Sequence, residues 1–310
     1  MSLLADGRSV DGAAAVPDAP SRRRAVPPHG GRTFAPTTLG LGAVIPVLGA
    51  HSQAGTSGIA LAVADAAART GRRVLLVDCA DPARSGLAGA CDVEGRSVAG
   101  TRRAAGIRLA SRHLPRGIGV SVRRLLGTGT PMRPDELPTL TSWVAADHNE
   151  FDLTVVDIGW DVWSLTVPDS GLGPLTWATG RPGEVFPMIV MRATAASVAL
   201  AEGVLTRYLA GVEPFGLVQP HGVAVVGAGS WPARTRNVMG FQLARLAHRA
   251  LFVPASSEAA VAGWTTDPAP TASVRAATAL LKTVNRSAAP ATRTNSPSRR
   301  GAAHPAERSR

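Results

Sequence analysis

Short apolar runs alternate with longer helical stretches through the middle of the sequence. Six runs of four or five mostly apolar residues stand out, at 44–48, 74–78, 153–157, 188–192, 223–226 and 251–254. The stretches that predict helices lie at 56–70, 134–147, 195–210, about 234–249 and about 271–284. A less regular region before residue 130 predicts two further strands, near 107–110 and 118–122.

This pattern predicts an α/β fold with three layers. Because the runs are apolar at consecutive positions, the strands should be buried on both faces, as in a mostly parallel sheet with helices on both faces. Ligands of such sheets bind beyond the carboxyl ends of the strands. The loop after residue 48, Asp78 and Asp157 all follow or end predicted strands. We therefore expect these three segments to converge on one site.

The two ends of the chain differ from this middle part. Residues 1–36 and 285–310 are rich in Ala, Pro and Arg and show no apolar period. That composition predicts disordered arms. One folded domain is then expected over 37–284, a length that suits a single α/β domain.

The charge of the chain, +11 in total, bears on its partners. Residues 283–310 carry six Arg and one Glu, so the predicted tail is basic. Nucleic acid is one partner that suits such a tail, and a tail that only keeps the protein in solution explains the same charges. Lys282 is the only lysine among 33 Lys and Arg, a bias typical of G+C-rich genomes and of an actinobacterial-type composition.

Cysteine content and hydropathy bear on whether the protein is disulfide-rich, zinc-binding, membrane-spanning or secreted. Cys79 and Cys91 are too few for a disulfide framework and lack the spacing of a zinc site, so we expect buried structural thiols. The sequence contains no apolar run of about 18 residues that would predict a membrane helix, and its N-terminus shows no signal-peptide pattern. The sequence therefore predicts a cytoplasmic protein without a membrane span.

The segment after the first predicted strand carries the clearest candidate chemistry. It joins a strand to a helix, which is the context of a phosphate-binding loop. Backbone N–H groups of such a loop and the positive end of the helix attract phosphate, and a hydroxyl at the helix start holds Mg²⁺. Candidate nucleotide-binding residues are Gly49, His51, Ser52, Gln53, Ala54, Gly55, Thr56 and Ser57.

These residues resemble, in altered form, the loop of the ParA/MinD family of P-loop ATPases, which reads roughly Lys-Gly-Gly-x-Gly-Lys-Thr. Over that pattern, His51 stands at the family's signature lysine and Thr56 at the lysine that reaches the phosphates. Gly55 and Ser57 keep the glycine and the Mg²⁺-binding hydroxyl. TadZ/CpaE-like members, which act in pilus assembly, also have Thr at the lysine position, and this loop is similar to theirs.

The resemblance continues beyond the loop and covers about 43–284. Asp78 ends a strand similar to the family's second strand, whose following Asp-x-Asp-Pro is one residue longer here and places the second carboxylate at Asp81. Asp157 ends a strand similar to the Walker B strand. The resemblance implies that Asp78 and Asp157 are catalytic residues and that Ser57 and Asp157 are metal ligands.

The resemblance also implies what the protein does. It implies a P-loop NTPase-like fold, ATP and Mg²⁺ as ligands, and a switch or scaffold that positions a partner in plasmid partition or transfer, secretion or pilus assembly. A protein partner and a homodimer are implied in the same way. Since removing one preorganised charged group typically lowers a rate by about 10²–10³, the replacement of lysine by Thr56 predicts ATP hydrolysis that is weak or absent.

Three other interpretations stay open. A slow ATPase would use an Arg in place of the lysine, because guanidinium groups match phosphate geometry. A pseudo-ATPase would keep the fold as a protein scaffold and bind no nucleotide. A non-specific DNA binder would use its Arg-rich arms. The arginines that follow predicted strand ends, and so suit the first interpretation, are Arg84, Arg192, Arg234 and Arg236.

Overall fold

The computed structural model describes residues 36–101, 104–127, 129, 131–147, 149–167 and 172–288. The predictions for residues 1–35 and 289–310, which include most of both arms, fall outside these described residues. Within them, none of the helices combines the length and apolar character that crossing a membrane requires.

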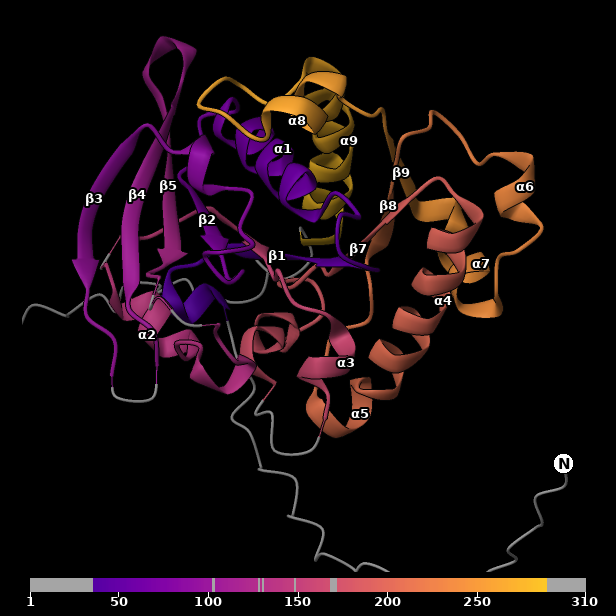
Figure 1. The fold of residues 1–310 in the computed structure, drawn as a ribbon, viewed down its shortest axis with the longest axis horizontal. Helices are drawn as coiled ribbons and strands as arrows, with labels where there is room; N and C mark the ends of the chain where they lie inside the picture. Colours follow the sequence, from indigo (N-terminus) through magenta and orange to yellow (C-terminus); the bar gives the residue numbers. More distant parts are fainter. Residues whose placement is uncertain are drawn as a thin grey trace, which may run out of the picture. The chain divides into compact units, whose positions relative to one another are not determined.

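The strands of the described residues form one nine-stranded sheet in the order β3-β4-β5-β2-β6-β1-β7-β8-β9 (Figure 1). From β5 to β9 all neighbours are parallel, whereas β4 runs antiparallel to both β3 and β5. The mostly parallel α/β fold is therefore confirmed. The strands are β1 (Ala43–Gly49), β2 (Val74–Asp78), β3 (Val93–Val98), β4 (Ile107–Leu114), β5 (Ile118–Leu125), β6 (Leu153–Asp157), β7 (Met188–Arg192), β8 (Gly222–Val226) and β9 (Ala250–Val253).

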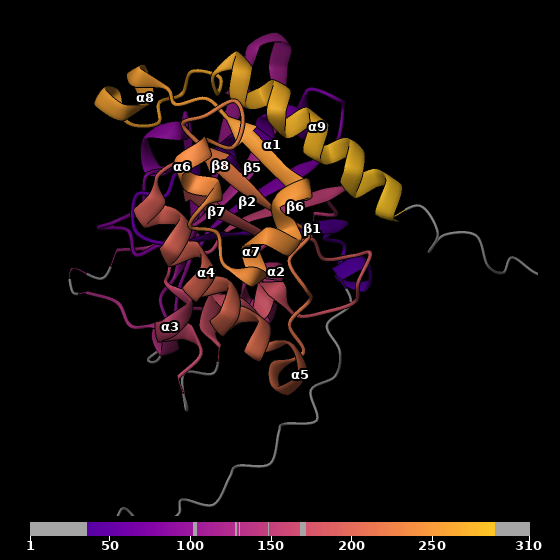
Figure 2. The ribbon, with the colours of Figure 1, turned by 90° about the vertical axis from the view of Figure 1, so that its right-hand side faces the viewer.

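Helices cover both faces of this sheet, as Figures 1 and 2 show. On one face lie α1, α8 and α9, and on the other lie α2, α3, α4, α5 and α7. Short α6 follows β8. The α-helices of the described residues are α1 (Thr56–Ala68), α2 (Leu140–Ala145), α3 (Val162–Leu165), α4 (Ala195–Ala210), α5 (Val212–Phe215), α6 (Ala233–Arg236), α7 (Phe241–Leu246), α8 (Ser257–Ala262) and α9 (Thr271–Ala288).

The strand residues alternate between two apolar clusters, one on each side of the sheet. In β1, Ile45 and Val47 belong to the cluster that contains α1 and α9, whereas Val44 and Leu48 belong to the cluster that contains α4. Successive side chains of a strand point to opposite faces. A strand that is apolar at every position is therefore buried on both faces of the sheet. This burial explains why the sequence pattern located the central strands.

Most predicted elements are confirmed, and three of the strands and α4 have the predicted bounds. The prediction of a single helix over 134–147 is wrong. This segment contains a 3-10 turn, Pro134–Glu136, followed by α2. Leu137 between them is extended because it precedes Pro138, which disfavours helical backbone. Helix α9 continues past residue 284, where the sequence prediction ends it.

The helix predicted over about 234–249 is also divided, into α6, α7 and a short 3-10 turn. The break at Gly240 has a packing reason. The Glu202 carboxylate of α4 accepts hydrogen bonds from the N–H groups of Gln242 (2.9 Å) and Leu243 (2.8 Å), so it caps the start of α7. A Cβ atom at Gly240 would lie 2.2 Å from Cδ of Glu202, so a larger residue here would displace the capping carboxylate.

Candidate functional site

The loop between β1 and α1 turns sharply around small residues. A Cβ atom at Gly49 would lie 2.6 Å from Oγ1 of Thr56, so the strand end and the helix start approach closely only because residue 49 is glycine. Gly55, the residue before the helix, has a left-handed backbone with φ of 103°. No side chain caps the N-terminus of α1. The free N–H groups of the first turn are therefore left to bind something else, and a helix start of this kind favours an anion.

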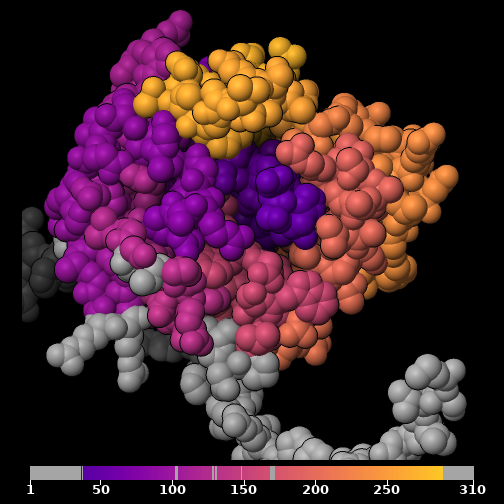
Figure 3. Space-filling model, viewed as in Figure 1, coloured from indigo at the N-terminus to yellow at the C-terminus, as the bar shows by residue number. Residues whose placement is uncertain are grey.

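This loop forms one wall of a cavity of about 700 Å³. In Figure 3 the indigo surface of the early part of the fold is exposed between the yellow C-terminal segment and the orange and pink surface of the second half. The polar and loop residues that line it are Gly49, His51, Ser52, Gln53, Gly55, Thr56, Ser57, Arg84, Asp157, Asp161 and Arg192. The mostly apolar residues that line it are Val226, Val253, Pro254, Ala255, Ala259, Ala260 and Trp264.

Two carboxylates meet beside this cavity. Asp78 and Asp157 end adjacent parallel strands and are paired in register, and each is 1% exposed. Asp78 is satisfied: it accepts hydrogen bonds from the Ser85 hydroxyl and from the N–H of Ala80 at 3.1 Å. Neither carboxylate oxygen of Asp157 has a hydrogen-bond partner, and Asp157 lines the cavity. A buried carboxylate without a partner is costly, so a cation bound in the cavity would stabilise Asp157.

Burial also changes the protonation of the pair. Burial, helped by the nearby Asp78 carboxylate, raises the pKa of Asp157 to about 7, against the opposing effects of the Ser57 hydroxyl and the Gly159 N–H, which lie near the carboxylate but outside hydrogen-bonding geometry. Burial likewise raises the pKa of Asp78 to about 6, opposed by its hydrogen bonds from Ser85 and Ala80 and by Arg124. Near neutral pH, a proton or a cation must therefore compensate for part of this buried charge.

Side-chain hydrogen bonds connect the loop to β7 and α4. Nε2 of His51 lies 2.7 Å from the Ser197 hydroxyl, and Nδ1 lies 2.6 Å from the carbonyl oxygen of Ser52. Since a carbonyl only accepts, Nδ1 carries the proton in the neutral ring, and Nε2 accepts from Ser197. The Ser197 oxygen in turn accepts from the backbone N–H of Arg192 at 2.8 Å. His51 thus holds the loop in place as well as lining the cavity.

Trp264 forms a wall of the cavity that the sequence analysis did not identify. Its ring lies against the first turn of α1, where a Cβ atom at Gly58 would lie 2.2 Å from Cζ2 of the indole. A Cβ atom at Gly86 would lie 3.4 Å from Cδ1 of the same ring. The tryptophan thus lies in a slot that two glycines keep open. An isolated tryptophan far along the chain gave no sequence signal for this position.

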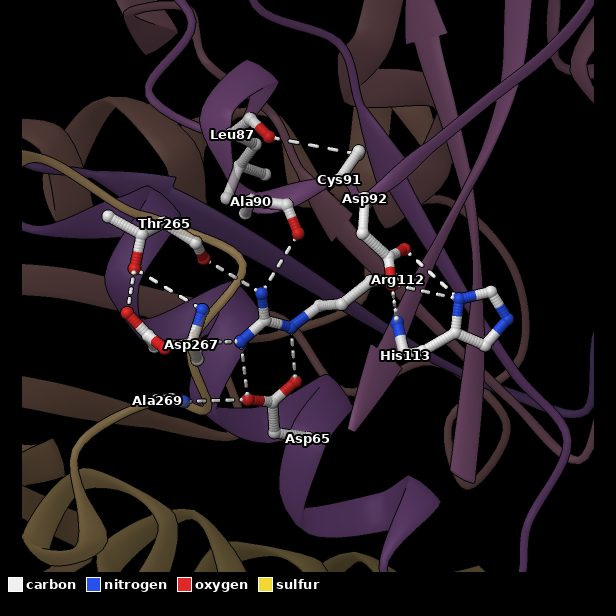
Figure 4. A network of polar contacts seen from close by, with 10 residues as sticks. All are labelled: Asp65, Leu87, Ala90, Cys91, Asp92, Arg112, His113, Thr265, Asp267 and Ala269. Atoms are coloured by element: carbon white, nitrogen blue, oxygen red, sulfur yellow. Dashed lines mark hydrogen bonds and ion pairs between the residues drawn. The ribbon is translucent and has the colours of Figure 1, made fainter. Parts of the chain in front are cut away.

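A buried ion pair holds the segment after Trp264, as Figure 4 shows. Arg112 of β4 and Asp65 of α1 are both 0% exposed, and Nε and Nη2 of the guanidinium contact the two carboxylate oxygens at 3.0 and 3.1 Å. Arg112 also donates to the carbonyl oxygens of Ala90 (2.8 Å), Thr265 (2.9 Å) and Asp267. The N–H of Ala269 donates to Asp65 at 2.8 Å. This cluster therefore joins α1, β4 and the loop that carries the Trp264 wall.

The predicted site residues largely come together. Gly49, Ser57 and Asp157 all line the cavity, as do the other predicted loop residues except one. That exception is Ala54, which is 1% exposed and lies among the apolar residues of the α1 side. Asp78 does not line the cavity either, although it is the neighbour of Asp157. The predicted convergence of three strand ends is therefore present in the fold. Of the two thiols, Cys79 is buried and Cys91 is partly buried.

The sheet and its helices form a P-loop NTPase-like α/β fold. This fold is that of MinD: the cell division ATPase MinD of Pyrococcus furiosus superposes with a TM-score of 0.51 at 15% identity, over 78% of this chain and 100% of that one. MinD of Aquifex aeolicus gives 0.50 at 14% identity, over 77% and 97%. MinD of Pyrococcus horikoshii, solved in complex with Mg-ADP, gives 0.48 at 14% identity, over 80% and 98%.

These comparisons confirm the predicted resemblance to ParA/MinD proteins at the level of the fold. In sequence, no protein-family model matches the chain, and no curated protein matches it.

Proposed function

We propose that this protein is a MinD/ParA-like nucleotide-binding switch or scaffold that binds ATP with Mg²⁺, hydrolyses it slowly or not at all, and positions a partner. The single observation that carries the proposal is the pair of unpartnered Asp157 oxygens in a cavity that also contains the uncapped start of α1. One feature favours a cation and the other an anion, a combination that suits a metal-bound phosphate.

The shape of the cavity supports a nucleotide in particular. A volume of about 700 Å³ suits a ligand of this size. The loop residues that line the cavity offer backbone and side-chain groups for phosphates, and lining residues such as Val226 and Pro254 offer apolar surface for a planar base. Ser57 and Asp157 are the residues that would hold Mg²⁺, which prefers oxygen ligands.

The absence of a lysine argues against efficient turnover. Thr56 replaces it at the start of α1 and has only a neutral hydroxyl, and both ring nitrogens of His51 already have hydrogen-bond partners. Charge that develops on the phosphates during transfer would therefore lack the group that usually stabilises it, at a cost of about 3–4 kcal/mol. Nucleotide occupancy rather than hydrolysis would then set the state of the protein.

The proposed partner is another protein or a second copy of this chain. Exposed apolar side chains support this part of the proposal: Leu200 of α4 is 51% exposed and Phe241 of α7 is 70% exposed. Positioning a plasmid, a secretion complex or a pilus base is the proposed context. It follows from the sequence resemblance to ParA/MinD and TadZ/CpaE-like proteins.

Calorimetric titration with Mg-ATP tests the proposal. The wild type should bind one nucleotide per chain, and Asp157→Ala should weaken binding of Mg-ATP at least about tenfold, or about 1.4 kcal/mol. Arg73→Gln, at an exposed ion pair directly before β2 and outside the cavity, is the control and should bind as the wild type does. No heat and no thermal shift with Mg-ATP would refute nucleotide binding and leave a protein scaffold.

A slow ATPase is the second candidate. It is favoured by the two arginines that line the cavity and by the Asp157 pKa of about 7, which is close to the value that suits a general base. Phosphate release by the purified protein decides between the two candidates. Turnover that Asp157→Ala abolishes would support an enzyme, whereas turnover that survives this change would come from another site or a contaminant.

A further inference from the structure

We propose that Arg84 and Arg192 bind the phosphate groups of the ligand in place of the missing lysine. This inference rests on the nucleotide-binding function proposed above, and it names the residues that give the site its positive charge. The chemical class of ligand that it specifies is a metal-bound oligophosphate.

The two arginines flank the loop. Arg192 is the last residue of β7, and Arg84 lies in the segment that follows β2. In the sheet order β2-β6-β1-β7, they stand on either side of β1, whose end leads into the loop. Both side chains line the cavity, and both residues are exposed, so a ligand can reach them.

Arg192 is also fixed to the loop itself. Its Nε donates a 2.9 Å hydrogen bond to the carbonyl oxygen of Gln53. Gln53 is one of the non-glycine residues with positive φ, 64°, so its backbone takes a sparsely populated conformation next to the arginine. A guanidinium that is held through Nε still presents its two amino groups, the fork that binds phosphate in a bidentate way.

Neither arginine is neutralised by the protein. Among the described residues, Arg84 and Arg192 form no ion pair, although Asp157 and Asp161 line the same cavity. The Asp161 carboxylate is hydrogen-bonded to Ser164 instead: it accepts from the N–H at 2.9 Å and from the hydroxyl at 2.6 Å. The fold therefore keeps guanidinium and carboxylate groups apart across the cavity. A phosphate bridging to a divalent cation is complementary to both.

The other two arginines that follow strand ends do not share this position. Arg234 and Arg236 of α6 do not line the cavity, and Arg236 donates to the carbonyl oxygen of Trp231 at 3.2 Å. Arg234 and Arg236 are both exposed and lie outside the cavity, so the double variant Arg234→Gln/Arg236→Gln removes the same two positive charges and is the matched control.

Binding is measured by calorimetry with two probes, Mg-ATP and inorganic triphosphate with Mg²⁺. The triphosphate lacks the base, so it reports phosphate recognition alone. The double variant Arg84→Gln/Arg192→Gln should bind both probes at least tenfold more weakly than the wild type, and the control Arg234→Gln/Arg236→Gln should bind within twofold. Unchanged thermal unfolding of the Arg84→Gln/Arg192→Gln variant without ligand would show that it folds, as expected for two exposed side chains.

A rescue sharpens the test. Adding Thr56→Lys to the Arg84→Gln/Arg192→Gln variant restores an ammonium group at the helix start and should recover at least part of the lost triphosphate affinity. An Arg84→Gln/Arg192→Gln variant that loses less than tenfold would overturn the assignment of the arginines and leave nucleotide binding intact. A wild type that binds neither probe would instead refute the proposed function, so the two failures are distinguishable.

Discussion

The two buried charged clusters of this protein differ in one respect. Around Arg112, the five N–H groups of the guanidinium all have acceptors, and Asp65 accepts from both Arg112 and Ala269. Around Asp157, a carboxylate of similar burial has no partner at hydrogen-bonding geometry, only the nearby Ser57 hydroxyl and Gly159 N–H, and it borders a second carboxylate. In the first cluster, groups of the chain itself compensate for the buried charges. In the second, only a proton or a bound ligand can compensate for the charge of Asp157.

This difference indicates which cluster has a structural role and which has a functional one. A buried ion pair with every hydrogen bond made holds elements together and gives a ligand no reason to enter. A buried carboxylate that faces a cavity destabilises the unliganded fold, and such a group persists where a ligand compensates for it. Perturbing each cluster should therefore have opposite effects on stability.

The largest effect should come from the Arg112 cluster. Asp65→Asn removes one charge and leaves Arg112 buried and unpaired, which should lower the free energy of unfolding by about 3–5 kcal/mol. Urea denaturation monitored by circular dichroism measures this change. Arg73→Gln, which breaks an exposed pair with Asp152, should cost no more than about 1 kcal/mol. Equal losses for the two variants would mean that the Arg112 cluster has no special structural role.

The Asp157 cluster should show the reverse effect, with a pH dependence. The pKa of Asp157 is about 7 in the fold against an ordinary 3.8, so between about pH 4 and pH 7 the folded protein holds a proton that the unfolded chain has lost. Asp157 should therefore make the stability of the unliganded protein fall as pH rises through this window, by up to about 1.4 kcal/mol per pH unit, and Asp78, with its pKa of about 6, should add to this fall below about pH 6.

Asp157→Asn tests this sign. Asparagine keeps the shape without the charge, so the variant should lose the slope between about pH 6 and pH 7, should keep the part below about pH 6 that Asp78 contributes, and should be more stable than the wild type at pH 8. Thermal unfolding from pH 4 to 8 without added metal measures both quantities. A variant that is less stable than the wild type at pH 8 would show that Asp157 is compensated within the chain.

The smallest effect concerns the Trp264 wall. Gly58→Ala adds a methyl group that would lie 2.2 Å from the indole, so Trp264 must move. The better helix propensity of alanine, about 1 kcal/mol, offsets part of the resulting strain, and the net stability change should be small. The emission of Trp264, taken as the difference from a Trp264→Phe variant, should shift.

Gly203→Ala is the matched control for this change. Gly203 lies in α4, where an added Cβ atom would meet nothing within 4 Å. This substitution should raise stability by about 0.5–1 kcal/mol and leave the tryptophan emission as it is. Identical emission in the Gly58→Ala variant would contradict the packing of Trp264 on α1.

Sequence reasoning located the fold because the central strands are buried on both faces. Runs such as Val74–Asp78 and Leu153–Asp157 are apolar at nearly every position, and they were predicted to the residue. Strand β3 was missed because it is an edge strand whose residues are mostly exposed and include Glu94 and Arg96, so it has no apolar run to detect.

The site was predictable only in part, for a similar reason. The loop and Asp157 stand at strand ends, where a rule of topology places ligands, and the structure brings them together. Arg112 and Trp264 depend on contacts between segments far apart in the chain. In the sequence, Arg112 is an ordinary polar residue of a strand, and only the fold reveals that Asp65 faces it. Likewise, only the structure shows that Arg84 and Arg192 line the cavity and that Arg234 does not.

The most direct test of the account is a crystal structure grown with Mg²⁺ and a non-hydrolysable ATP analogue. We predict phosphates at the start of α1 between the guanidinium groups of Arg84 and Arg192, with the metal ion on the Asp157 side of the cavity. An analogue bound elsewhere, or a cavity without ligand at saturating concentration, would contradict the claim that this lysine-free loop still binds a metal-bound nucleotide.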